Sequence, residues 1–174
     1  MRLSKYDYSQ EGAYYVTICT QDRRCMFGVI RDGMLVLNDY GCIADRCWRE
    51  IPVHFPHVIL DEFVIMPNHV HGILLISNKR NGGTRHAVSQ QEARTFGKPE
   101  HGSLSTIMRS FKSAVTKQIN LMRNTNIARI WQGRFYEHII RNEKSYDAIR
   151  RYITENPRQW PNNEDNPDNM KNTG

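Results

Sequence analysis

Two histidines separated by a single residue are the clearest chemical feature of the sequence. Residues 66–76 read MPNHVHGILLI, and the Pro-Asn pair before the first histidine predicts a bend followed by a strand. Alternate residues of a strand point to the same face, so we expect His69 and His71 to lie side by side. Two imidazoles with additional oxygen ligands suit Mn²⁺, Mg²⁺ or Zn²⁺. The alternative is that they are two unrelated histidines of a buried sheet.

A tyrosine and an asparagine four residues apart form a second candidate group. Asn142 is a suitable N-cap for a helix over about residues 143–155, and at helical spacing Tyr152 and Asn156 share one face. A phenol loses its proton more readily in a cationic, metal-bearing site, which makes Tyr152 a candidate nucleophile. The Asn156 amide oxygen would be a further ligand for the same metal. The alternative is a core tyrosine, with Asn156 ending the helix before Pro157.

Positive charge is concentrated in one part of the chain. The chain carries +6 overall, and residues 102–160 alone carry +7, with 11 Lys and Arg against 4 Asp and Glu. Such a basic region indicates a polyanionic partner. Residues 131–142 (WQGRFYEHIIRN) interleave aromatic side chains with arginines, which suits base stacking and phosphate contacts but also fits a half-buried strand. The candidate contacts are seven basic side chains: Arg109, Lys112, Lys117, Arg134, Arg141, Arg150 and Arg151.

Local patterns predict the elements that would position these residues. Strands are expected where β-branched and aromatic residues cluster, and helices where apolar residues recur every three or four positions. The predicted strands are residues 13–20, 26–30, 34–37, 58–66, 69–76 and 130–140. The predicted helices begin after Asn38, Ser103 and Asn142, and the second has the apolar stripe Leu104, Ile107, Met108, Phe111, Val115, Ile119 and Met122. This order indicates an α+β fold with a mostly antiparallel sheet and helices on one or both faces.

The length of 174 residues predicts one domain, which we place at residues 1–160. Residues 77–102 are polar and without periodicity, which predicts a mobile surface loop, and residues 161–174 have the composition of a disordered acidic tail. No apolar run approaches the ~18 residues of a membrane span. The four cysteines form no CxxC pair, which indicates reduced thiols and, with the lack of a secretory pattern, a cytoplasmic protein.

In combination, these motifs resemble the IS200-like single-tyrosine HUH transposases, and within them the branch associated with repetitive extragenic palindromes (REP). The resemblance rests on MPNHVHGILLI followed by WQGRFYEHIIRNEKSYDAIRRYITENP, and it extends from about Tyr14 to Pro157. It implies the HUH core, a central antiparallel sheet of ferredoxin-like or RRM-like character with helices packed on it. That expectation agrees with the order of elements predicted above.

The resemblance also implies an activity and roles for individual residues. Proteins of this kind bind single-stranded DNA hairpins formed by palindromic repeats, cleave nearby through a covalent 5′-phosphotyrosine intermediate, and rejoin the strand, with Mn²⁺ or Mg²⁺ as the metal. His69 and His71 match the metal-binding pair, Tyr152 the nucleophile, and Asn156 a third metal ligand. His138 belongs to a recurring motif without an assigned role. Whether the working form is a monomer or a homodimer stays open.

Two other functions are compatible with parts of the sequence. A domesticated relative would bind hairpin nucleic acid without cutting it, although such a binder has no need of His69, His71 and Tyr152. A zinc-dependent hydrolase would combine the histidine pair with a carboxylate such as Glu62 or Glu137, but this leaves the tyrosine and the basic region without a purpose.

Overall fold

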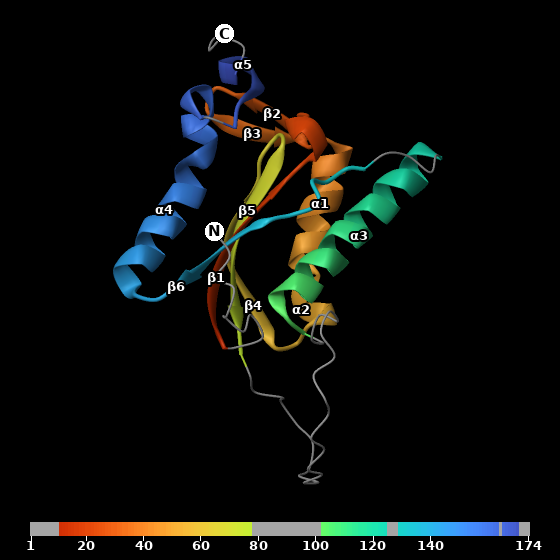
Figure 1. Cartoon of the computed structure of the whole chain (residues 1–174). Coiled ribbons are helices and arrows are strands. Elements are labelled where there is room, and N and C mark those ends of the chain that lie inside the picture. The colour runs from red at the N-terminus through yellow and green to blue at the C-terminus, as the bar shows by residue number, and fades with distance from the viewer. Residues whose placement is uncertain (1–10, 78–101, 125–128, 164, 171–174) are drawn as a thin grey trace, which may run out of the picture.

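The computed structural model describes residues 11–77, 102–124, 129–163 and 165–170. Its centre is a four-stranded antiparallel sheet in the order β4-β5-β1-β6 (Figure 1). The strands of this sheet are β1 Gly12–Cys19, β4 Val58–Ile65, β5 His69–Ile76 and β6 Tyr136–Ile140. The α+β prediction with a central antiparallel sheet is confirmed. The loop expected at residues 77–102 lies outside the described residues except for its two ends.

Helices cover both faces of this sheet (Figure 1). Helices α1 (Asp39–Arg49) and α3 (Leu104–Arg123) lie on one face, and α4 (Glu143–Gln159) lies on the other. The face beneath α1 and α3 forms the main core, in which Tyr14, Val16 and Ile18 of β1 are fully buried. A smaller cluster beneath α4 contains Ile73, Ile140 and Ile153, with Tyr146 and Ile149 packed against it.

The caps and the apolar stripe predicted for the helices are present. The side chains of Asn38, Ser103 and Asn142 each accept a hydrogen bond from a backbone N–H in the first turn of the helix that follows. The stripe of α3 is buried from Leu104 to Ile119. Met122 is an exception, because it lies in the last turn of α3 and is exposed.

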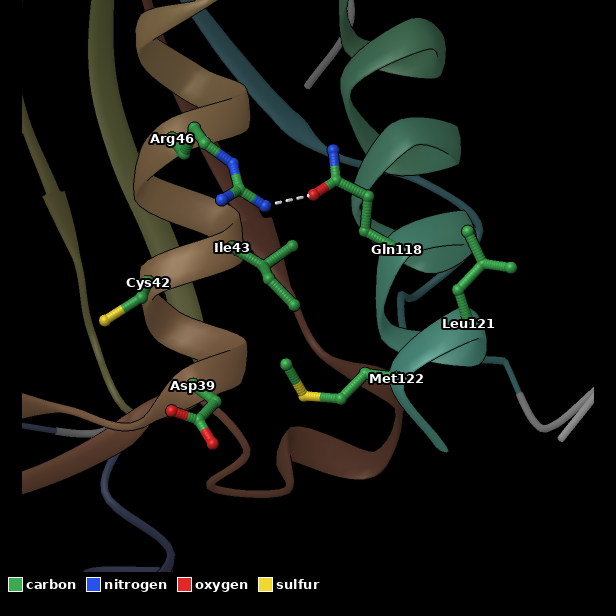
Figure 2. Close-up of a pocket in the computed structure, with 7 residues that line it drawn as sticks. All are labelled: Asp39, Cys42, Ile43, Arg46, Gln118, Leu121 and Met122. Carbon is green, nitrogen blue, oxygen red and sulfur yellow. Dashed lines mark hydrogen bonds between the residues drawn. The ribbon is translucent and has the colours of Figure 1, made fainter. Parts of the chain in front are cut away.

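A shallow cavity opens between α1 and the C-terminal half of α3, as Figure 2 shows. Its lining residues are Asp39, Cys42, Ile43, Arg46, Gln118, Leu121 and Met122. The cavity therefore belongs to the layer opposite α4.

A two-stranded hairpin and several short helical segments complete the described part. Strands β2 (Gly28–Arg31) and β3 (Met34–Leu37) pair around Asp32 and Gly33, which both have positive φ as a tight hairpin turn requires. The short helical segments are η1 Gln21–Arg23, α2 Ile51–His54, η2 Trp160–Asn162 and α5 Pro167–Met170. Among the helices of the described residues, none is both long and apolar enough to cross a membrane.

Several predicted boundaries were wrong. Strand β6 begins only at Tyr136, because the preceding stretch bends and Trp131 forms just an isolated bridge to Thr20. Helix α4 continues through Pro157 to Gln159, so Asn156 is not its C-cap. The tail is folded over its described residues, because side chains of Asn163 and Asn166 accept backbone hydrogen bonds that close successive turns.

Gly72 allows one strand to serve both layers. It lies in β5 between His71 and Ile73, on the face that carries the main core, and the ring of Trp48 in α1 rests directly on it. A Cβ at Gly72 would lie 2.2 Å from an atom of that ring. Only glycine therefore permits this close approach behind the histidine pair.

Substituting Gly72 with alanine should lower the free energy of unfolding by about 1–3 kcal/mol, because the new methyl group overpacks the core against Trp48. Chemical denaturation of the purified variant measures this loss. Gly133→Ala is the matched control, since no atom lies within 4 Å of the Cβ it would add. Equal stability of Gly72→Ala and the unaltered protein would contradict the packing described here.

Candidate metal centre and nucleophile

Strand β5 places the two histidines side by side, as its alternation predicts. The ring centroids of His69 and His71 are 4.4 Å apart, and both side chains are almost fully buried. The Nε2 atoms of both rings are buried and have no hydrogen-bond partner among the described residues. Buried polar atoms normally have partners, so this pair of open nitrogens indicates a ligand.

Asn68 fixes the proton on His69. Its amide nitrogen donates to the backbone oxygens of Arg23, at 3.1 Å, and of Asp165, at 2.7 Å. The amide oxygen must therefore face His69, where it lies 2.8 Å from Nδ1. Because this oxygen can only accept, Nδ1 of His69 carries the proton and Nε2 presents a lone pair. Asn68 thus positions a ligand atom, a role the sequence analysis did not assign.

Two hydroxyl groups of β1 hold the second ring. Nδ1 of His71 lies 2.8 Å from the Tyr15 hydroxyl and 2.9 Å from that of Thr17. The Tyr15 ring is also stacked on His71. A metal at Nε2 would select the tautomer with its proton on Nδ1, and either hydroxyl oxygen can accept a hydrogen bond from that N–H. Tyr15 and Thr17 were missed at the sequence level because only the pairing of β1 with β5 brings them to the site.

Burial keeps both imidazoles neutral. It lowers the pKa of His71 from 6.5 to about 3 and holds the pKa of His69 well below 6.5, with the neighbouring ring of His71 as a further cause. Neutral imidazole is the form that ligates metals. At neutral pH, therefore, protons do not compete for the two open Nε2 atoms.

Tyr152 approaches the pair from α4 of the same chain. Its ring centroid lies 5.3 Å from that of His71, and 40% of the residue is exposed. Tyr15 is also adjacent to His71, but burial raises its pKa and its hydroxyl is engaged by Thr17 and His71. Of these two phenols, Tyr152 is the more exposed.

Polar contacts with β4 set the position of α4. The Tyr146 hydroxyl donates to Asp61, and the Arg150 guanidinium pairs with Asp61 at 3.3 Å and with Glu62 at 3.5 Å. Both acidic residues lie where the pairing of β4 with β5 shifts register. Burial and the hydrogen bond to Asp61 raise the pKa of Tyr146 to about 12, so this phenol stays protonated as a donor. Helix α4 is thereby attached through Tyr146 and Arg150, within the two turns before Tyr152.

Asp165 is a third possible ligand that the sequence analysis missed. A carboxylate oxygen of Asp165 and one ring nitrogen from each of His69 and His71 all lie within 4.8 Å of one another. Its side chain also pairs with Arg23, which holds it in place. The only sequence signal was an aspartate in a segment with the composition of a disordered tail. Two imidazoles and one carboxylate form a donor set that fits a divalent metal.

Asn156 is fully buried one turn beyond Tyr152. Its amide oxygen accepts a hydrogen bond from Asn163 at 3.4 Å, whereas its amide nitrogen has no partner among the described residues. An amide nitrogen does not ligate metals but can donate to an anion such as a phosphate oxygen. In this arrangement Asn156 would act as a metal ligand only if its amide turned.

The two carboxylates considered for a hydrolase do not join the histidine pair. Glu62 is paired with Arg150 on β4. Glu137 is the cross-strand neighbour of Val16, so it lies on the core face of the sheet rather than on the face of the histidines.

The seven predicted basic residues do not form one surface. Arg109, Lys112 and Lys117 belong to α3 on one face of the sheet, and Arg150 and Arg151 belong to α4 on the other (Figure 1). Two are already engaged: the Lys112 amine donates to the backbone oxygens of Gln132 and Gly133, and Arg150 is paired with β4. The exposed members are Arg109, Lys117, Arg134, Arg141, Arg150 and Arg151.

The fold is similar to that of a solved transposase. The described structure superposes on a REP-associated tyrosine transposase bound to a REP hairpin with a TM-score of 0.59 and 21% sequence identity, covering 90% of this chain and 73% of that one. The chain belongs to the same family as an uncharacterized protein of Haemophilus influenzae, to which it is 41% identical over 160 residues. That alignment covers 92% of this chain and 88% of its relative. No family model matches the sequence.

Mn²⁺ should bind this site and raise the temperature of unfolding, because a ligand of the folded state stabilises it. His71→Ala should abolish the binding, which isothermal titration calorimetry measures directly. Asn68→Ala should weaken it by about 10- to 100-fold, since it releases the His69 ring without removing a ligand. His138→Ala, at an exposed histidine of β6, is the control. An unchanged titration with His71→Ala would exclude a metal at this pair.

The same titration separates the two candidates for the third ligand. Asp165→Asn should weaken Mn²⁺ binding, whereas Asn156→Ala should leave it nearly unchanged, because only the former residue offers an oxygen to the histidine pair in this arrangement. The reverse result would assign the third ligand to Asn156.

The metal-free protein should lose stability as the pH falls below 6.5. Below this pH, His71 binds a proton in the unfolded chain, whereas in the folded chain it does so only near pH 3. The free energy of unfolding therefore decreases by up to about 1.4 kcal/mol per pH unit for each proton that only the unfolded chain binds. Urea denaturation with a chelator between pH 7.5 and 5 measures the slope. His71→Asn should reduce the slope and the exposed-site variant His138→Asn should not. Equal slopes for these two variants would show that folded His71 titrates normally.

Proposed function

We propose that this chain is a single-strand DNA endonuclease and strand transferase of the single-tyrosine HUH type, in the REP-associated branch. It would bind DNA hairpins formed by palindromic repeats, cleave the adjacent strand through a covalent 5′-phosphotyrosine, and rejoin it. Tyr152 is the proposed nucleophile, and His69 and His71, with Asp165 or Asn156, hold a divalent metal, Mn²⁺ or Mg²⁺.

One observation carries the proposal. The accessible phenol of Tyr152 lies beside His71, within one chain, at a pair of buried imidazoles whose Nε2 atoms are without partners in the described residues. A non-cleaving hairpin binder gains nothing from burying two open nitrogens, because each buried polar group without a partner costs stability. The nuclease function is therefore better supported than binding alone.

The residues of the chain divide the chemistry between them. When bound, the metal would supply positive charge to the scissile phosphate. Tyr152 attacks phosphorus, so that the phenolic O–P bond forms as the P–O3′ bond breaks. The proton lost by the phenol is balanced by the proton gained by the 3′ oxygen. The buried amide nitrogen of Asn156 is available to donate to a phosphate oxygen in the site. Attack by another 3′-OH reverses the step and joins a new strand without consumption of ATP.

The partner is proposed to be hairpin DNA with an unpaired flank. The structural neighbour named above was solved with a REP hairpin, and the exposed side chains of Arg134, Arg141 and Arg151 would contribute phosphate contacts here. Lys112 and Arg150 would act mainly through their contacts within the protein. Such a protein would work in the cytoplasm, at the nucleoid while bound to DNA.

Tyr152→Phe should bind hairpin DNA as the unaltered protein does but form no covalent adduct, because the ring is kept and the attacking oxygen is lost. The assay uses labelled single-stranded hairpins from the flanks of the gene, incubated with Mn²⁺ or Mg²⁺ and separated on a denaturing gel. Tyr40→Phe, at a tyrosine of α1 on the opposite face, should form the adduct normally.

Either of two results would overturn part of this proposal. An adduct formed by Tyr152→Phe would remove Tyr152 as the nucleophile. Binding of several flank hairpins by the unaltered protein without any adduct, in the presence of either metal, would establish the non-cleaving binder in its place.

A further inference from the structure

Part of the sheet face that carries the histidines is not covered by α4. The helix is held at the β4 side by the contacts of Tyr146 and Arg150, and its apolar residues cover the end of β6 at Ile140. At the other end of β6 lies Tyr136, which is 51% exposed. Among the described residues, β6 is an edge strand with no further strand beside it (Figure 1).

The register of the sheet places Tyr136 in line with the metal centre. Thr17 pairs with His71 on one side and with Tyr136 on the other, so the three side chains point to the same face. Two strand spacings separate Tyr136 from His71, about 10 Å. The Tyr136 ring meets the edge of the Tyr15 ring at a centroid distance of 6.2 Å, and Tyr15 is stacked on His71. A row of aromatic rings thus leads from solvent to the histidine beside Tyr152.

The surroundings of Tyr136 suit a nucleic-acid strand. Arg134 precedes it and Arg141 follows β6, and both arginines are exposed. Exposed aromatic rings and cationic side chains on one surface are the groups by which proteins hold unpaired bases and their phosphates. A protein partner would instead be expected to need a larger apolar surface, whereas the neighbouring residue on this face, His138, is polar and exposed.

We infer that the ring of Tyr136 is the stacking surface for an unpaired base of the bound DNA strand, next to the phosphate at Tyr152. The inference rests on the proposed function for the identity of the strand. It adds a binding site for a nucleobase at the open end of β6. Stacking on one ring tolerates any base, so this site would hold the strand in place rather than read its sequence.

Substitutions that keep or remove the ring test the inference. In a Tyr152→Phe background, which prevents cleavage, Tyr136→Leu should weaken binding of a fluorescein-labelled hairpin with an unpaired 5′ arm by about 5- to 150-fold, the range measured for loss of one base–aromatic stack. Tyr136→Phe should bind within about twofold of the parent, because the ring is retained. Leu121→Ala, an exposed apolar residue on the opposite layer, is the control.

Salt dependence distinguishes stacking from charge. Tyr136→Leu should lower affinity by the same factor at all salt concentrations, because a stacked base displaces no counterions. Arg134→Gln should instead reduce the slope of log K against log salt by about one, because one phosphate contact is lost. Unchanged affinity of Tyr136→Leu, or equal weakening in the leucine and phenylalanine variants, would overturn the inference. A circular-dichroism spectrum and unfolding temperature equal to those of the parent show that Tyr136→Leu is folded.

A photochemical experiment locates the base independently. An unpaired arm carrying 5-iododeoxyuridine should cross-link on irradiation to the peptide that contains Tyr136, and cross-links confined to other peptides would contradict the site. Failure here is separable from failure of the proposed function. A protein that forms the Tyr152 adduct but is indifferent to Tyr136→Leu refutes only the stacking site, whereas stacking without any adduct refutes only the cleavage.

Discussion

Strand β5 is buried on both faces, and each face requires different side chains. On one side the Trp48 ring must touch the backbone, which only Gly72 permits, and on the other side His69 and His71 must lie open to a ligand. The alternation of a strand satisfies both requirements at once. The candidate metal centre therefore shares its backbone with the core behind it, and a change in Trp48 or Gly72 reaches the imidazoles through that one strand.

The site depends equally on groups that do not face the substrate. Asn68, Tyr15 and Thr17 occupy the Nδ1 side of the two imidazoles and leave the Nε2 side open. Their hydrogen bonds fix the rings before any metal arrives, so less conformational freedom is lost on binding. Asn68 also donates to the backbone oxygens of Arg23 and Asp165, so one side chain joins an N-terminal and a C-terminal segment next to β5.

The sequence was sufficient to predict those parts of the fold and the site that local periodicity determines. The strand alternation placed His69 and His71 together, whereas the position of Tyr152 beside His71 was expected only from the family resemblance. It was insufficient where contacts join distant segments. The tail was judged by its composition, yet Asp165 is held by partners some 100–140 residues earlier, Asn68 and Arg23, that no local pattern could indicate. Net charge likewise could not reveal that α3 and α4 carry their arginines and lysines on opposite layers.

The attachment of α4 to β4 has a kinetic consequence. Asp61 and Glu62 hold α4 of the same chain, so that Tyr152 lies beside the histidines of its own chain. In the proposed reaction, a first cut would therefore involve one protein molecule, and its rate per molecule would stay constant on dilution. Any coordination between two DNA ends would have to come from successive occupancy of one nucleophile, in time, rather than from two nucleophiles arranged in space.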